Sequence, residues 1–140
     1  MTCSEIMTKD PECCVPSDSV MKVAQLMKSE DVGPIPIVED KEEKKLTGIV
    51  TDRDLAVKVV AEARDPKTTQ VEEVMSEGLV TCRENDDVQS VLKLMEDNQL
   101  RRIPVVDRND RLMGIIAQAD VATRIGSSRA TANVVEQVSR

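Results

Sequence analysis

The sequence predicts an α+β protein built from two repeats, each with the order strand, helix, strand, strand, helix. The first indication is the segment Ile-Pro-Ile-Val at residues 35–38, which recurs as Ile-Pro-Val-Val at residues 103–106. The second is a Gly-Ile pair that begins at Gly48 and again at Gly114, and that is followed in both copies by an aspartate, Asp54 or Asp120. A period of about sixty residues is too long for ordinary solenoid units and suits two small modules packed together.

Apolar periodicity and turn residues place the elements of the first repeat. Residues 1–10 form an approach segment that docks through Ile6 and Met7. Ser17 or Asp18 is expected to cap a helix whose apolar residues recur at helical spacing. The expected elements are a short strand over residues 11–15, a helix from residue 20, strands over 35–38 and 46–50, and a helix over 52–62.

The second repeat follows a linker that starts with Asp65-Pro66 and contains no apolar residue up to Thr69. Asn85 or Asp86 is expected to cap its first helix. The expected elements are a helical turn over residues 70–75, a strand over 79–82, a helix from residue 88, strands over 102–107 and 112–117, and a helix over 118–125. We therefore divide the chain into a first repeat (1–63), a linker (64–73), a second repeat (74–126) and a C-terminal tail (127–140), whose Val134, Val135 and Val138 fit one more helix.

The composition excludes several classes of function. The 140-residue chain contains no histidine and no aromatic residue. This excludes Ser-His-Asp and Cys-His catalysis, and also an aromatic platform for nucleic-acid bases. A net charge of −7 argues further against nucleic acid as a partner. Because we find neither a signal peptide nor an apolar run of membrane length, we expect a cytoplasmic protein that does not enter a membrane.

The four cysteines, Cys3, Cys13, Cys14 and Cys82, form no C-x-x-C pair. Cys14 and Cys82 occupy equivalent positions in the two repeats, which favours a strand position that uses a small apolar side chain. Buried, reduced thiols are the favoured interpretation, since free cysteine is among the most buried residue types. A redox or metal role is the alternative.

Thr51 and Asp54 lie where a predicted strand turns into a helix. The unpaired N–H groups at a helix start suit a phosphate, and a carboxylate there can accept two sugar hydroxyls. Thr51 as N-cap with Asp54 at the third helical position also approximates a capping box, which only holds the helix end. Spacing alone favours the cap, because caps are far commoner than nucleotide sites. The second copy has Ala117 in place of the threonine, so the two repeats differ in chemistry.

The repeated Ile-Pro strand, the element order and the Gly-x-x-Thr-x-x-Asp motif resemble a tandem pair of CBS (cystathionine β-synthase) domains, also called a Bateman module. The resemblance covers roughly Ile6 to Gly126. It implies two repeats packed sheet to sheet around a pseudo-twofold axis, with clefts between them. It also implies a non-catalytic regulatory or sensor module that binds an adenine nucleotide such as AMP, ADP or ATP.

The resemblance also implies a ligand site, formed mainly by the first repeat. Asp54 is expected to hold the ribose, Thr51 to lie near the phosphate, and Arg101 and Arg102, just before the second Ile-Pro strand, to face the phosphate. The alternative for the two arginines is that they are only solvated, as is usual for a charged pair before an edge strand. Asp120 is the counterpart of Asp54, but Ala117 cannot donate a hydrogen bond, so the second cleft is expected to bind weakly or to be vacant. The expected site residues are Ile35, Pro36, Gly48, Thr51, Asp54, Val80, Thr81, Arg101, Arg102 and Asp120.

Two alternatives to the sensor remain open at this stage. One is a scaffold with the same fold that has lost its ligand and mediates homodimerisation and contact with an unidentified protein partner. The other is a thiol switch based on Cys13, Cys14 or Cys82. We expect a homodimer, because Val57, Val60 and Val121 lie on helices that one subunit leaves uncovered. No arrangement of side chains in the sequence indicates an enzyme.

Overall fold

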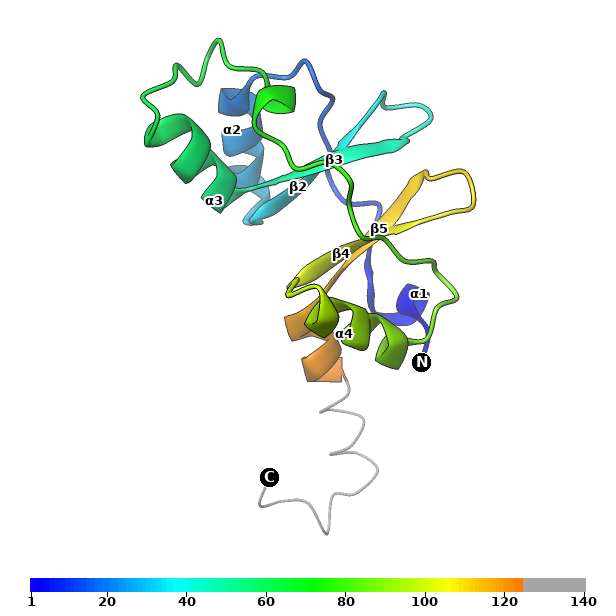
Figure 1. Ribbon diagram of the computed structural model, residues 1–140. Helices are drawn as coiled ribbons and strands as arrows, with labels where there is room; N and C mark the ends of the chain where they lie inside the picture. Colours follow the sequence, from blue (N-terminus) through cyan, green and yellow to red (C-terminus); the bar gives the residue numbers. More distant parts are fainter. Residues whose placement is uncertain (125–140) are drawn as a thin grey trace, which may run out of the picture.

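Two antiparallel strand pairs, each accompanied by helices, make up the two halves of the protein in a computed structural model that describes residues 1–124 (Figure 1). The predicted α+β class and the two-repeat architecture are confirmed. The end of the second repeat at residue 126 and the expected tail helix lie outside the described residues. The elements are α1 (Cys3–Ile6), β1 (Thr8–Lys9), α2 (Val20–Glu30), β2 (Pro34–Val38), β3 (Leu46–Thr51), α3 (Asp52–Leu55) continuing as a π-helix (Ala56–Val60), a 3-10 turn (Val71–Glu73), α4 (Val88–Asp97), β4 (Arg102–Val106), β5 (Leu112–Ala117) and a helix over residues 118–124.

The strands expected over residues 11–15 and 79–82 are each reduced to one bridging residue. Cys14 pairs in parallel with Ile37 of β2, and Cys82 pairs in the same way with Val105 of β4. Cys14 donates its N–H to the Pro36 carbonyl at 3.1 Å and accepts from the Val38 N–H at 2.9 Å. The chain then turns at once, because the Asp18 N–H bonds back to the Val15 carbonyl. The pairing therefore stops after one residue.

The long helices α2 and α4 form where the sequence predicts them, but the predicted caps were wrong. Ser19 caps α2 by accepting a hydrogen bond from the Lys22 N–H at 3.1 Å, and Asp87 caps α4. The expected caps Asp18 and Asp86 instead accept from backbone N–H groups in the preceding turns. Several cap-forming side chains stand in a row at both sites, and backbone geometry selects the last of them.

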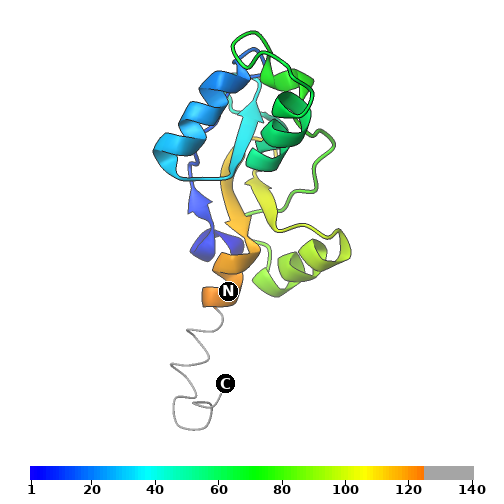
Figure 2. The same ribbon diagram turned by 90° about the vertical axis from the view of Figure 1, so that its left-hand side faces the viewer.

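Short segments of the chain are exchanged between the two halves (Figures 1 and 2). The N-terminal α1 and β1 lie in the second half, where Thr8 pairs with Ile115 of β5. Residues 70–76 lie in the first half, where Ser76 pairs with Ile49 of β3. The core of the first half contains Cys14, Val20, Val23, Met27, Ile35, Ile37, Val50, Val59, Val71 and Val74. The core of the second half contains Cys3, Ile6, Cys82, Val88, Val91, Met95, Ile103, Val105, Ile116 and Val121.

The exchange explains the glycines of both motifs. A Cβ atom on Gly48 would lie 2.7 Å from the Met75 sulfur and 2.8 Å from the Ser76 carbonyl oxygen. A Cβ atom on Gly114 would lie 2.7 Å from both the Met7 sulfur and the Thr8 carbonyl oxygen. Each glycine therefore gives the crossing segment room to lie against the strand.

The loops of the two hairpins hold the halves together at one end. The Leu46 N–H donates to the Asp110 carbonyl at 3.0 Å, and the Leu112 N–H donates to the Lys44 carbonyl at 2.8 Å. Each loop thus bonds to the start of the other repeat's strand, as expected of a pseudo-twofold axis between the repeats. Buried Cys13, Val38 and Leu112 pack together there.

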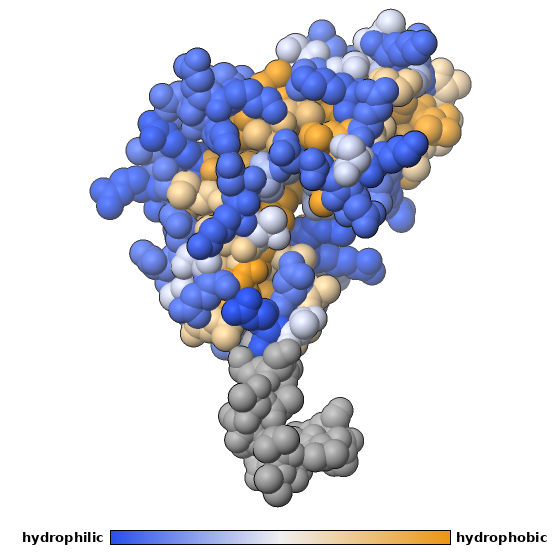
Figure 3. Space-filling view, turned by 180° about the vertical axis from the view of Figure 1, so that it is seen from behind, coloured by the Kyte–Doolittle hydropathy of each residue, from blue (hydrophilic) through white to orange (hydrophobic). Residues whose placement is uncertain are grey.

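The face of the molecule seen in Figure 3 is mostly hydrophilic, with apolar residues visible among the hydrophilic ones. Within residues 1–124, no helix has the length and apolar character needed to cross a bilayer. The expectation that Val121 is uncovered was wrong, because Val121 is fully buried in the second core. Val57 and Val60 are 49% and 76% exposed, as expected.

Candidate functional site

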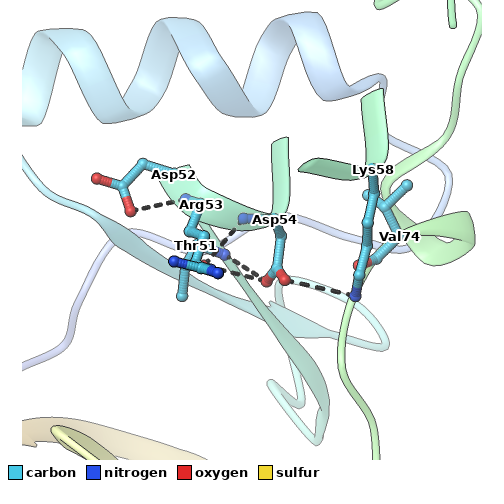
Figure 4. Close-up of polar contacts among 6 residues, drawn as sticks. All are labelled: Thr51, Asp52, Arg53, Asp54, Lys58 and Val74. Carbon is cyan, nitrogen blue, oxygen red and sulfur yellow. Dashed lines mark hydrogen bonds and ion pairs between the residues drawn. The ribbon is translucent and has the colours of Figure 1, made fainter. Parts of the chain in front are cut away.

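Thr51 and Asp54 meet at the junction of β3 and α3, where they form a complete capping box (Figure 4). The Asp54 N–H donates to Thr51 Oγ1 at 3.2 Å, and the Thr51 N–H donates to Asp54 Oδ2 at 2.9 Å. The Thr51 hydroxyl also lies 3.2 Å from Asp54 Oδ2, to which it donates. The interpretation favoured by spacing alone is therefore present in the structure. The Asp54 side chain remains 19% exposed.

Lys58 is a third member of this cluster, which the sequence analysis missed. Its Nζ lies 3.4 Å from Asp54 Oδ1 and donates to the Val74 carbonyl at 3.0 Å. Lys58 thereby ties the junction to the segment that crosses from the second repeat. The spacing of four residues between Asp54 and Lys58 was a usable signal, since side chains four apart on a helix are neighbours.

Arg102 of the second repeat also lies near the start of α3. A Cβ atom on Gly33 would lie 3.4 Å from both carboxylate oxygens of Asp52 and 3.5 Å from Nη2 of Arg102. The Asp52 N–H donates to the Gly33 carbonyl at 3.0 Å, which fixes the start of α3 against the start of β2. The first repeat's junction and the second repeat's arginine thus face each other over Gly33.

The two arginines also line an open cavity of about 440 Å³ at the second repeat's junction, between β5 and the helix that follows. The cavity is lined by Arg101, Arg102, Ala117, Gln118, Ala119 and Ala122. Three of these six side chains are alanines, which give the cavity part of its lining as apolar surface. Ala117 has no hydroxyl group, so the second junction cannot form the complete capping box that Thr51 and Asp54 form in the first. The second junction therefore combines cations with an apolar surface, but lacks the polar pair of the first.

The other expected site residues lie farther from Thr51 and Asp54. Ile35 and Pro36 belong to β2 and stand opposite Val50 and Ile49, so they back the junction from within the sheet. Val80 packs against the second core. Thr81 lines a separate pocket of about 240 Å³ together with Thr47, at the start of β3. Thr47 and Thr51 are four residues apart along the strand, roughly 13 Å, so the structure does not bring Thr81 to the capping box.

All four cysteines are buried and unpaired by disulfides. Burial raises the pKa of each thiol, that of Cys14 to about 11. The sulfur atoms of Cys3 and Cys82 lie 4.0 Å apart in the second core. In the part of the chain that the structure describes, no three Cys, Asp or Glu side chains are grouped to hold a metal ion. These observations favour structural, protonated thiols over a redox switch.

Comparison with known sequences supports the two-repeat interpretation. Residues 3–61 and 71–127 each match the family model of the CBS domain. The CBS domain-containing protein YhcV of Bacillus subtilis is 36% identical over 135 residues, which make up 96% of this chain and 93% of YhcV. An uncharacterized protein of Methanopyrus kandleri is 33% identical over 117 residues, and the match spans 59% of its length.

Solved structures show the same architecture. Hypoxic Response Protein I, crystallised with two coordinated zinc ions, has a TM-score of 0.78 and 33% identity, with 88% of this chain and 98% of that chain covered. The CBS domain pair of protein MJ0100, in complex with 5′-methylthioadenosine and S-adenosyl-L-methionine, has a TM-score of 0.78 and 29% identity, with 91% and 98% covered. With both repeats matched in sequence and in fold, the chain belongs to the CBS domain family.

Proposed function

We propose that the chain is a non-catalytic regulatory module that binds an adenine nucleotide at the junction of β3 and α3, between the two repeats. The observation that carries this proposal is the position of Arg102. An arginine from the second repeat lies beside the start of α3, where the first repeat holds its Thr51–Asp54 pair. A guanidinium group and a carboxylate held on facing repeats suit a ligand with a phosphate at one end and a sugar diol at the other.

The chemistry of the ligand follows from the residues present. The MJ0100 domain pair binds two compounds that share an adenosine group. A carboxylate has about four acceptor sites, so Asp54 keeps acceptor capacity beyond its cap contacts. It can accept hydrogen bonds from ribose hydroxyls when Lys58 moves away from Oδ1. Aliphatic side chains of the neighbouring strands supply the surface for the base. AMP, ADP and ATP are the candidates for this chain.

The absence of catalysis is part of the same proposal. Nucleophilic and general acid–base mechanisms need a base held next to the reacting group, and the chain contains no histidine. Asp54 is occupied by its cap and by Lys58, and no second carboxylate pairs with it among the residues that the structure describes. Binding at the junction instead changes the contacts between the repeats, which is how we expect the ligand to regulate a partner.

The proposal is tested by titrating adenosine and AMP into the wild type and into two matched variants, Asp54→Ala and Asp120→Ala. Asp54→Ala is expected to weaken ribonucleotide binding by about tenfold or more, because a charged hydrogen-bond acceptor is lost. Asp120→Ala is expected to leave affinity nearly unchanged. The wild type is also expected to bind 2′,3′-dideoxyadenosine more weakly than adenosine.

Isothermal titration calorimetry measures the affinities, and thermal melts measure the stability of the same samples. If Asp54→Ala lowers the melting temperature and leaves affinity and sugar discrimination unchanged, Asp54 is only a cap and the nucleotide site is disproved.

A ligand-free scaffold that forms homodimers is the second candidate, and the exposed Val57 and Val60 favour it. Both side chains lie on the helical segment after Leu55, and burying them in a symmetric contact removes apolar surface from water. We propose a homodimer through this face, whichever candidate holds. Light scattering at micromolar concentration is expected to give twice the chain mass of 15.5 kDa. A measured mass of one chain would rule this interface out, and so would a Val60→Asp variant that keeps the mass of a dimer.

A further inference from the structure

We infer that Asp52 sets the charge of the ligand that the junction accepts, and that it selects adenine nucleosides carrying at most one phosphate over the di- and triphosphates. This inference rests on the proposed function. Asp52 follows Thr51 and lies near Arg102 of the second repeat, and neither the motif nor the capping box uses it.

The position of Asp52 relative to Arg102 is the first support. Both carboxylate oxygens of Asp52 lie 3.4 Å from the point where a Gly33 Cβ atom would stand, and Nη2 of Arg102 lies 3.5 Å from that point. The two groups are therefore no more than 6.9 Å apart. They do not form a direct ion pair among the residues that the structure describes, so Arg102 keeps its donors available for a ligand. A phosphate on Arg102 then lies close to a fixed negative charge.

Asp52 is held in this position by two backbone contacts. Its Oδ1 accepts from the Arg53 N–H at 2.9 Å, and its own N–H donates to the Gly33 carbonyl at 3.0 Å. Gly33 has no side chain to separate the acid from the arginine. The negative charge is therefore placed by the start of α3 and does not depend on a long flexible side chain.

The second repeat has the same backbone contact, but neutral residues stand at the positions of Asp52 and Arg102. Gln118 stands where the first repeat has Asp52, and its N–H donates to the Arg101 carbonyl at 2.7 Å. The counterpart of Arg102 is Pro34. Asp52 and Arg102 therefore face each other on only one of the two sides of the pseudo-twofold axis. A neutral glutamine in the matched position shows that the backbone contact itself does not require an acid.

The energetic consequence is a penalty that grows with the charge of the ligand. Asp52 repels every negative charge of the ligand, and Arg102 offsets this repulsion for the first phosphate only. Both side chains are exposed, so water and salt weaken the repulsion without abolishing it. Adenosine, which carries no charge, does not sense Asp52.

The test is to titrate adenosine, AMP and ATP into the wild type and into Asp52→Asn at low ionic strength. The asparagine keeps an oxygen for the Arg53 N–H, so the local fold is preserved. Adenosine affinity is expected to stay unchanged, AMP to bind about threefold more tightly and ATP about tenfold more tightly in the variant. Both gains are expected to shrink when salt is raised to about 0.5 M.

Asp97→Asn is the matched control, because Asp97 is an exposed acid on α4 and its loss changes the net charge by the same amount. An equal gain for Asp97→Asn, or an unchanged ATP-to-adenosine ratio in Asp52→Asn, would overturn the role of Asp52 while the proposed function stands. If the wild type binds none of the three ligands, the proposed function fails and the inference fails with it.

Discussion

Each repeat contains one pair of antiparallel strands, and the two pairs have the same register but differ at the end next to the junction. Ile35, Pro36 and Ile37 pair with β3 in the same register as residues 103–105 pair with β5, and both ladders shift at the following valine. The end pair is Pro34 with Thr51 in one repeat and Arg102 with Ala117 in the other. Buried positions therefore preserve the backbone, while one partly exposed pair at the junction carries the difference in chemistry.

Substitutions at Gly48 and Gly114 test whether the two repeats have equivalent backbones, and they are expected to have the largest effect on stability. Gly48→Ala and Gly114→Ala should each lower the free energy of unfolding by about 1–3 kcal/mol, because the new methyl group meets a backbone carbonyl that cannot move aside alone. Urea unfolding followed by far-UV circular dichroism measures both. Gly33→Ala is the control, since its Cβ would make only ordinary contacts of 3.4–3.5 Å with the ends of long side chains. Clearly unequal costs for Gly48 and Gly114 would show that the crossing segments support the two repeats differently.

The junction itself is tested by exchanging its hydroxyl. Thr51→Ala should lower stability by about 0.5–2 kcal/mol through loss of the cap, and Ala117→Thr should raise it by up to about 1 kcal/mol by creating one. Thermal melts of the two variants and of the double exchange measure both signs. If the Ala117→Thr variant has the same melting temperature as the wild type, the two junctions are not equivalent, because Asp120 then does not occupy the capping position that Asp54 occupies.

The equivalent cysteines provide the smallest expected effect, which depends on pH. Burial raises the folded-state pKa of Cys14 and of Cys82 above the ordinary value of 9.0. The stability that the protonated thiols contribute is fully present below pH 9, and it is lost as pH rises from 9 toward the folded pKa, about 11 for Cys14. Replacing either cysteine with alanine should therefore reduce the fall in stability between pH 7.5 and 9.5 by about 0.8 kcal/mol. A fall as steep as in the wild type would show that the thiol titrates normally in the folded protein.

Much of the fold was predictable because the same sequence pattern occurs in both repeats. The Ile-Pro strand, the helix periodicity and the glycine recur in register, so each copy supports the interpretation of the other. The capping box of Thr51 and Asp54 was predictable too, because it depends only on local spacing.

Features that depend on distant contacts were not predictable. The apolar residues of the helix after β5 do not reveal that Val121 faces the core. Ile6 predicts that the N-terminal segment packs against the protein, but the sequence does not show that it packs against the second half. The family resemblance implies that Arg102 faces a phosphate, but it does not place Arg102 beside Gly33 and Asp52, which are far from it in the sequence. The local pattern of Gly33-Pro34 indicates only the end of a helix. The sequence division at residues 63 and 74 describes the order along the chain, whereas the packing crosses it.

The exchanged segments also govern how the chain can fold. The contact between Cys3 and Cys82 spans 79 positions, so α1 leaves the ribosome long before the strands that receive it have been synthesised. The first core in turn lacks Val71 and Val74 until the linker has been made. Neither repeat holds its complete core alone, and contacts of such long sequence separation slow folding. The two halves are therefore expected to unfold as a single cooperative unit, although the sequence describes them as two modules.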